Sequence, residues 1–285
     1  MSDAAGTPQI AYETRQIELA DGTARTVLEL GDPDGVPLLL IHGMSGTHRH
    51  WGNAFLTGLL AAGRRIVCVN HIGVAGSTRA TAPFTIVDLA EAQVQALDVL
   101  GIADPVDVFG ISMGGMTAQE LVLRHPERVR SLVLGCTTAG NSLATWTAEA
   151  DMRGLVEAMQ SGDAALALRA SWEINVSAAF AAQADDYEEF VASTKAERVS
   201  LRVITEQMQA IIGQNTVDRL AQITVPTTIA HGTEDRLLPY PNGVAIHEAI
   251  PGSTLETFEG AGHLFFWEDP ARAVQVALEA SARAD

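Results

Sequence analysis

The chain alternates short apolar runs with amphipathic segments along most of its length. The apolar runs are aliphatic and β-branched without polar alternation, which is typical of strands buried on both faces of a parallel sheet. The segments between them carry apolar residues at helical spacing. The predicted strands are residues 38–41, 66–70, 106–111, 131–134, 227–230 and 254–258, and the predicted helices are residues 53–62, 86–100, 113–124, 243–249 and 270–283. This order predicts an α/β fold with a doubly wound, mostly parallel sheet.

Two further strand-like runs, residues 16–20 and 25–30, precede this alternation. Asp21-Gly22 lies between them and is typical of a tight hairpin turn, because glycine adopts the positive φ that such turns need. We therefore expect the sheet to begin with an antiparallel hairpin.

The alternation is interrupted over residues 142–222, which are rich in Ala, Glu, Gln and Met and contain no strand-like run. This composition predicts several helices. Long insertions in compact folds are usually functional, so we predict a helical cap over an active site. The predicted organisation is a core in two parts, residues 1–141 and 223–285, separated by this cap. The cap aromatics Trp146 and Trp172 either hold its helices together or face a substrate.

Composition narrows the classes of partner. Apolar residues make up 47% of the chain, which is enough for a large core. The 35 acidic residues against 18 Lys and Arg give a formal net charge of −17, so nucleic acid and anionic membrane surfaces are not expected as partners. No basic start followed by an apolar core and no bilayer-length apolar stretch is present, and we expect a cytoplasmic protein. Cys68 and Cys136 lie in apolar runs and are expected to be buried, reduced thiols.

The candidate nucleophile is Ser112, in the sequence Gly110-Ile111-Ser112-Met113-Gly114. This segment lies where a predicted strand passes into a predicted helix. A serine projected from such a sharp turn needs strained backbone angles, and the flanking glycines avoid side-chain clashes. The helix start also places free N–H groups beside the serine oxygen.

A serine nucleophile needs a base and a group that orients the base. His263 follows the last predicted strand in Gly260-Ala261-Gly262-His263, and Asp235 follows residues 227–230. Both loops lie at the sheet edge that carries Ser112, in the chain order expected for a Ser-Asp-His triad. Glu234 is the neighbouring alternative for the acid. The loop after residues 131–134, another place for this acid, contains no carboxylate.

Acyl transfer also needs two N–H donors that stabilise a negatively charged oxygen. The backbone N–H groups of Met113 and Met44 are the candidates, with Gly43 allowing close approach to the reacting atoms. His42 is expected to hold this loop by hydrogen bonds. The cluster His48-Arg49-His50-Trp51 lacks acidic or cysteine partners at a suitable spacing, so no metal site and no cofactor are expected.

Four segments give the chain a clear family resemblance: Leu40-Ile41-His42-Gly43, Gly110-Ile111-Ser112-Met113-Gly114-Gly115, Gly232-Thr233-Glu234-Asp235 and Gly260-Ala261-Gly262-His263. From about residue 26 to 282 the chain resembles the α/β-hydrolase superfamily, and within it bacterial serine esterases and haloperoxidase-like hydrolases with a helical cap, including polyketide methylesterases. One segment departs from the family pattern. Relatives commonly have Asp-x-Arg-Gly-x-Gly-x-Ser where this chain has residues 70–77, with Asn70 for Asp, Ile72 for Arg and Ala75 for the second Gly.

The resemblance implies a cofactor-free serine hydrolase acting on a small-molecule carboxylic ester or lactone. We expect an apolar pocket whose substrate contacts include Gly43, Trp146, Trp172, Phe265 and Trp267, although the residues after His263 could equally belong to the core. One alternative is a hydrolase of carbon–carbon bonds with the same triad, as in relatives from aromatic degradation. Another is a non-catalytic ligand-binding member of the superfamily.

Overall fold

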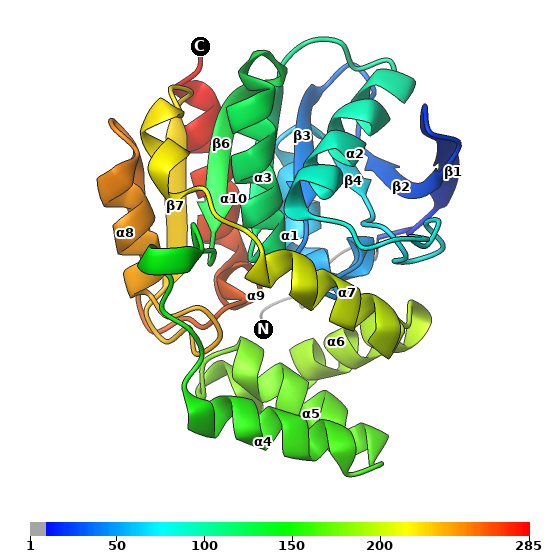
Figure 1. Cartoon of the computed structure of the whole chain (residues 1–285), viewed down its shortest axis with the longest axis vertical. Helices are drawn as coiled ribbons and strands as arrows, with labels where there is room; N and C mark the ends of the chain where they lie inside the picture. The colour runs from blue at the N-terminus through cyan, green and yellow to red at the C-terminus, as the bar shows by residue number, and fades with distance from the viewer. Residues whose placement is uncertain (1–9) are drawn as a thin grey trace, which may run out of the picture.

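The structure is a computed structural model that describes residues 10–285. Its centre is an eight-stranded sheet with the order β1-β2-β4-β3-β5-β6-β7-β8 (Figure 1). The strands are β1 (Thr14–Glu18), β2 (Ala24–Leu30), β3 (Val36–Ile41), β4 (Arg64–Val69), β5 (Val106–Ile111), β6 (Val129–Gly135), β7 (Thr227–Gly232) and β8 (Thr254–Phe258). β1, β2 and β4 pair antiparallel and all other neighbours pair parallel. The predicted mostly parallel sheet with an antiparallel start is confirmed.

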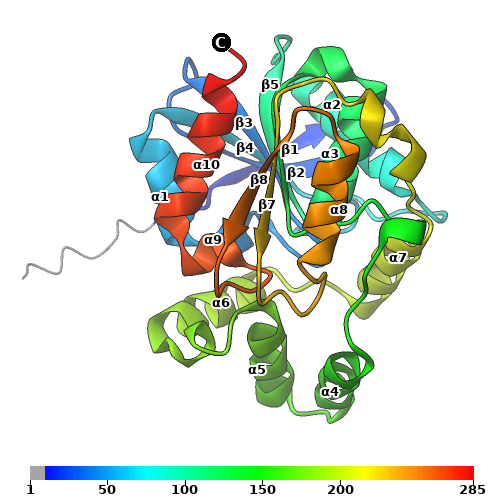
Figure 2. The same cartoon turned by 90° about the vertical axis from the view of Figure 1, so that its left-hand side faces the viewer.

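Helices cover both faces of the sheet (Figures 1 and 2). One face carries α1 (Asn53–Ala61) and α10 (Pro270–Ala282), and the other carries α2 (Ile86–Val99), α3 (Met113–Arg124) and α8 (Pro241–Ala249). α8 begins earlier than the sequence pattern predicts because Pro241 occupies its first position, where the missing N–H costs nothing. The short helix α9 (Phe265–Glu268) was not predicted, since one helical turn leaves no periodic pattern.

Two hydrophobic clusters follow from the two-residue period of the strands. In β3, Leu38 and Leu40 belong to the cluster that includes α1 and α10, whereas Leu39 and Ile41 belong to the cluster with α2 and α3. All four side chains are buried. This explains why the strand has no polar positions, as its sequence suggested.

The amino ends of the central strands carry a buried ion cluster around Asp107 of β5. Arg64 of β4 and Arg130 of β6 both bind its carboxylate, and Ser131 Oγ donates to it at 2.6 Å. The Asp107 and Arg64 side chains are nearly inaccessible to solvent. A buried charge of this kind is tolerated only with partners, and here the partners join β4, β5 and β6 at the sheet edge away from Ser112.

Four helices are inserted between β6 and β7, beyond the carboxyl edge of the sheet (Figure 1). They are α4 (Glu149–Gln160), α5 (Ala164–Asn175), α6 (Ala184–Ala196) and α7 (Leu201–Ile212). Asp163 caps α5, and Ser200 caps α7, by accepting hydrogen bonds from the first backbone N–H groups. Two of these helices therefore begin at capping residues that the local sequence supplies.

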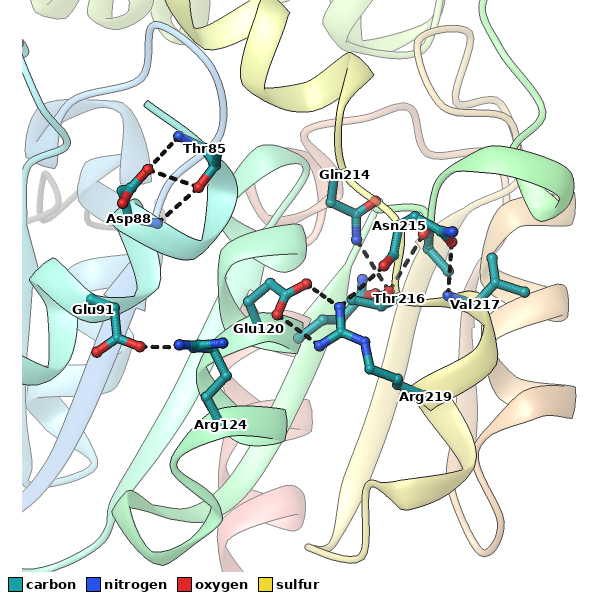
Figure 3. A network of polar contacts seen from close by, with 12 residues as sticks. Thr85, Asp88, Glu91, Glu120, Arg124, Gln214, Asn215, Thr216, Val217 and Arg219 are labelled. Atoms are coloured by element: carbon teal, nitrogen blue, oxygen red, sulfur yellow. Dashed lines mark hydrogen bonds and ion pairs between the residues drawn. The ribbon is translucent and has the colours of Figure 1, made fainter. Parts of the chain in front are cut away.

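The insertion rejoins the core through a polar network on α3 (Figure 3). Thr216 Oγ1 donates to Gln119 Oε1 at 2.5 Å, and its backbone N–H donates to the Ala139 carbonyl at 3.0 Å. Arg219 forms a bidentate ion pair with Glu120, whose side chain is almost fully buried. These contacts fix the returning chain against the helix that begins at the candidate nucleophile.

In the part of the chain that the structure describes, no helix combines the length and the hydropathy that crossing a lipid bilayer requires.

Candidate active site

Ser112 lies at a strained turn between β5 and α3. Its φ and ψ are 54° and −124°, a region that residues with side chains rarely adopt. The flanking glycines are sterically required, because a Cβ at Gly114 would lie 1.9 Å from the Ile41 carbonyl oxygen and one at Gly110 would lie 2.5 Å from the Gly114 carbonyl oxygen. The turn is held by hydrogen bonds from Ser112 N to the Gly135 carbonyl at 2.9 Å and from Thr137 Oγ1 to the Ser112 carbonyl at 2.7 Å.

The loop after β3 lies directly against the candidate nucleophile. β3 and β5 are neighbours in the sheet although β4 separates them in the chain, so their carboxyl ends meet at a topological switch point, where α/β sheets usually bind ligands. A Cβ at Gly43 would lie 2.9 Å from Ser112 Cβ and 3.3 Å from its Oγ. Within residues 10–285, the N–H groups of Met44 and Met113 donate to no protein acceptor. Both donors are therefore free to bind a negatively charged oxygen beside Ser112.

The inserted helices contribute to this loop as well. The side chain of Gln207 on α7 accepts a hydrogen bond from Ser45 N at 2.9 Å. Ser45 itself has a positive φ of 58°, so a residue of the inserted helices holds the loop in an uncommon conformation. Sequence reasoning missed this contact, because 162 residues separate the two partners along the chain.

His263 and Asp235 form a buried pair in the loops after β8 and β7. His263 Nδ1 donates to Asp235 Oδ2 at 2.7 Å, and the two side chains are 5% and 0% exposed. The other carboxylate oxygen, Oδ1, accepts from the N–H groups of Leu237 at 2.8 Å and Leu238 at 2.9 Å. The structure thus brings Asp235 to His263, whereas the sequence alternative Glu234 is exposed.

The pair is electrostatically coupled. Burial by itself would raise the pKa of Asp235 and lower the pKa of His263. The attraction between the two charges and their hydrogen bond outweigh burial, so the pKa of Asp235 lies well below its usual value and that of His263 well above. His231 also lowers the pKa of Asp235, because its Nε2 lies 3.2 Å from Asp235 Oδ2.

Cys136 lies between the candidate base and the nucleophile turn. It follows β6 directly, with a positive φ of 38°, and contacts both the His263 side chain and the Ser112 backbone. Burial raises the pKa of its thiol, and these contacts partly oppose that rise. Among residues 10–285, no direct hydrogen bond joins Ser112 Oγ to His263, but such bonds are often long before a substrate binds.

Sequence reasoning treated Cys136 only as a buried thiol. The sequence signal that could have marked Cys136 is its position directly after β6, because the loop after this strand is the alternative place for the acid of a triad. Cys136, Asp235 and His263 are also the one group of candidate metal ligands in the described part of the chain, with ligand atoms within 4.8 Å of one another. Asp235 and His263 of this group are hydrogen-bonded to each other.

The other histidines near the site support the loop after β3. His71 Nε2 donates to the His42 carbonyl at 2.8 Å, and His42 Nε2 donates to the His50 carbonyl at 3.3 Å. Burial lowers the pKa of His42 well below its usual value and that of His71 to about 4, so both rings are neutral near pH 7. In the atypical segment, Asn70 accepts from His48 N and donates to the Thr26 carbonyl, each at 3.0 Å.

The predicted aromatic substrate contacts lie in different environments. Phe265 is fully buried against Phe258, at a ring distance of 4.4 Å, so the geometry supports a core role for it rather than substrate contact. Trp172 of α5 is also fully buried, and its ring lies 5.8 Å from that of Trp267, where the inserted helices pack on the core. Trp146 is 49% exposed. Within residues 10–285, no hydrogen bond joins Phe265, Trp172 or Trp267 to Ser112, and their ring contacts are with other aromatic side chains.

Comparisons with known proteins agree with this geometry. A family model described as alpha/beta hydrolase fold matches residues 36–270. A 2-hydroxymuconate semialdehyde hydrolase of Pseudomonas putida is 30% identical over 281 residues, which cover 90% of each chain. A poly(3-hydroxyalkanoate) depolymerase of Ectopseudomonas oleovorans is 26% identical over 263 residues, covering 89% of this chain and 87% of that one.

Solved structures show the same fold. An esterase from Exiguobacterium antarcticum superposes with a TM-score of 0.80 at 23% identity, covering 94% of this chain and 98% of that one. The family resemblance expected from the four motif segments is confirmed by the family model, which spans all of them. The chain therefore belongs to the α/β hydrolase fold family and is a hydrolase.

Proposed function

We propose that the protein is a serine hydrolase that cleaves a carboxylic ester or lactone through an acyl-enzyme, with Ser112 as nucleophile, His263 as base and Asp235 as the orienting acid. The observation that carries this proposal is the buried 2.7 Å hydrogen bond between His263 Nδ1 and Asp235 Oδ2. Because a carboxylate only accepts, this bond places the His263 proton on Nδ1 and leaves Nε2 to take a proton from Ser112.

The reaction proceeds in two halves. Ser112 Oγ forms a bond to the carbonyl carbon and its proton passes to His263 Nε2, while the N–H groups of Met44 and Met113 bind the oxygen that becomes negative. The proton then passes to the leaving alcohol as the ester C–O bond breaks. In the second half, a water molecule attacks the carbonyl carbon of the acyl-enzyme and gives a proton to His263. This proton passes to Ser112 Oγ as the bond between Oγ and the acyl carbon breaks, which releases the acid and free Ser112. Asp235 stabilises the imidazolium formed in each half.

The surroundings of Met44 and Met113 support an apolar, medium-sized substrate. Met113 belongs to a hydrophobic cluster with Ile211 of the cap and Leu238, and Met44 and Ile72 pack against it. Ile72 stands where relatives commonly have arginine, so this chain replaces a charge with an apolar side chain beside the proposed oxyanion donors. The proposed cap, residues 142–222, would thus cover the site and help to select the substrate.

Carbon–carbon bond hydrolysis is the second candidate. The observation that favours it is the 30% identity to a 2-hydroxymuconate semialdehyde hydrolase over 90% of both chains. The same three side chains would serve, with the bond beside the carbonyl broken in place of the ester C–O bond. The two candidates therefore differ in substrate and not in the identity of the nucleophile.

A substrate panel with active-site variants tests both candidates. The panel contains p-nitrophenyl esters of graded chain length, lactones and a vinylogous 1,5-diketone acid. We expect ester or lactone turnover by the wild-type protein, a loss of at least about 10³-fold in Ser112→Ala, and little change in the control Ser161→Ala, whose serine is exposed at the end of α4. A serine-directed fluorophosphonate should label Ser112.

The outcomes separate the alternatives. Turnover of the diketone without any ester turnover would favour the second candidate. Undiminished turnover in a folded Ser112→Ala variant, or labelling of another serine, would refute the assignment of the nucleophile. Binding of substrate analogues without any turnover would instead indicate a ligand-binding protein of the same fold.

A further inference from the structure

The cap touches the loop of His263 on both sides of that residue. After His263, Leu264 N donates to the carbonyl of Asn175, the last residue of α5, at 2.8 Å. Before it, a Cβ at Gly262 would lie 2.6 Å from the Val176 carbonyl carbon and 2.8 Å from the next backbone nitrogen, so the cap backbone packs directly on the loop. The cap is therefore part of what fixes the position of His263.

One side chain joins the same two segments by accepting hydrogen bonds from both. Glu268, at the end of α9, accepts through Oε1 from Gly262 N at 2.7 Å and from Ser177 N at 2.9 Å. Its Oε2 accepts from Ser177 Oγ at 2.5 Å. A single carboxylate oxygen thus connects the backbone next to His263 with the cap, and neither N–H has another acceptor within residues 10–285.

We propose that Glu268 is a positioning residue that holds the catalytic base in place by bridging the cap and the loop of His263. This inference rests on the proposed function, in which His263 is the base. Gly262 precedes His263 directly, so a shift of its backbone would rotate the imidazole relative to both Asp235 Oδ2 and Ser112 Oγ. Misplacement of a catalytic group by about 1 Å can lower the rate about 100-fold.

The bridge depends on the reach of the side chain and not on its charge. A glutamine at position 268 can keep its carbonyl oxygen at the place of Oε1, while its NH₂ group donates to Ser177 Oγ, because a hydroxyl both donates and accepts. An aspartate keeps the negative charge but is one methylene shorter and cannot span Gly262 N and Ser177 N together. The two conservative variants therefore separate reach from charge. Both should fold, since Glu268 is only partly buried and lines a surface cleft.

The experiment compares Glu268→Gln and Glu268→Asp with a matched control. Glu189 of α6 also joins the cap to the core through one carboxylate–backbone bond, accepting from Asn53 N at 2.7 Å, but within the described residues it makes no hydrogen bond to the loop of His263. We expect Glu268→Asp to lower kcat about 10- to 100-fold with KM changed less than about twofold. Glu268→Gln should stay within about threefold of wild type, and Glu189→Asp should leave kcat unchanged.

A second readout needs no substrate. The His263 Nδ1 proton in the 2.7 Å bond to Asp235 should give a low-field proton NMR resonance. We expect this resonance in the wild type, Glu268→Gln and Glu189→Asp, and its weakening or loss in Glu268→Asp. A purely structural role for Glu268 would lower the melting temperature and leave both kcat and this resonance unchanged.

Several results would overturn the inference. Wild-type kcat and an intact resonance in Glu268→Asp would exclude a positioning role. An impaired Glu268→Gln variant beside a wild-type-like Glu268→Asp variant would show that charge matters and reach does not, and would exclude the bridge. If His263→Ala retains full turnover, the proposed function fails instead, and the NMR comparison still decides whether Glu268 fixes the His263 ring.

Discussion

Replacement of Asp235 by asparagine tests the proposed triad through its hydrogen bonds. Oδ1 of Asp235 accepts two backbone N–H groups, those of Leu237 and Leu238, whereas Oδ2 faces His263 and His231. The asparagine carbonyl must take the place of Oδ1, because the opposite amide orientation would point an NH₂ group at two N–H donors. Leaving those donors unpaired would cost about 1–3 kcal/mol each, so the first orientation dominates.

In that orientation the asparagine NH₂ donates to His263 Nδ1. The neutral imidazole must then carry its own proton on Nε2, the nitrogen that has to accept the proton of Ser112. The base is held in the wrong tautomer although the geometry is almost unchanged. Loss of the orienting acid in a triad typically lowers kcat about 10⁴-fold, which corresponds to about 5.5 kcal/mol in the activation free energy.

The assay measures kcat and KM with the best ester of the panel across pH, beside a urea-unfolding curve for each variant. Rates are compared on the alkaline plateau, where His263 is neutral in every variant, so that the difference reports the tautomer alone. Glu234→Gln is the matched control, because it neutralises the adjacent, exposed carboxylate. A folded Asp235→Asn variant that loses less than about tenfold in kcat would refute the proposed role of Asp235.

Three further predictions follow from the geometry. The pKa of His263 is raised, so kcat/KM should increase as pH rises through this pKa, which a pH–rate profile measures. Protonated His263 also contributes to the free energy of unfolding. This contribution is full below about pH 6.5 and is lost as pH rises through the same pKa, which urea unfolding at a series of pH values measures. Gly114→Ala should lower the free energy of unfolding by about 1–3 kcal/mol or more and abolish turnover, since its Cβ would meet the Ile41 carbonyl; a folded, fully active variant would contradict this. Asp107→Asn should lower the free energy of unfolding by about 3–5 kcal/mol in urea, because it leaves Arg64 buried without its charged partner, yet kcat should not change.

The parts of the fold that depend on local chemistry were predictable. The buried strands have no polar alternation, so a two-faced parallel sheet followed from β3, β5, β6 and β7 alone. Gly110 and Gly114 mark the turn of Ser112 because only glycine tolerates the backbone contacts found there. The chain order of motifs at strand ends also predicted the Asp235–His263 pair, since carboxyl ends of parallel strands share one edge.

The partners of these residues were not predictable, because they come together only when the chain folds. Glu268 and Ser177 are 91 residues apart, and nothing in either local sequence marks the contact. Cys136 reads as an apolar strand residue, and only the packing of β6 beside the loop of His263 brings its sulfur to the site. Phe265 lies two residues after His263, yet the turn of α9 directs its ring into the core.

The sequence by itself therefore determined the sheet, the nucleophile turn and the identity of the three proposed catalytic side chains. Each of these depends on backbone sterics or on a strand end that a few neighbouring residues encode. The tertiary structure decided which side chains support them, namely Gln207 at the loop after β3 and Glu268 beside His263. Those contacts join the inserted helices to the core across long separations in the chain, and their geometry depends on packing that no local pattern records.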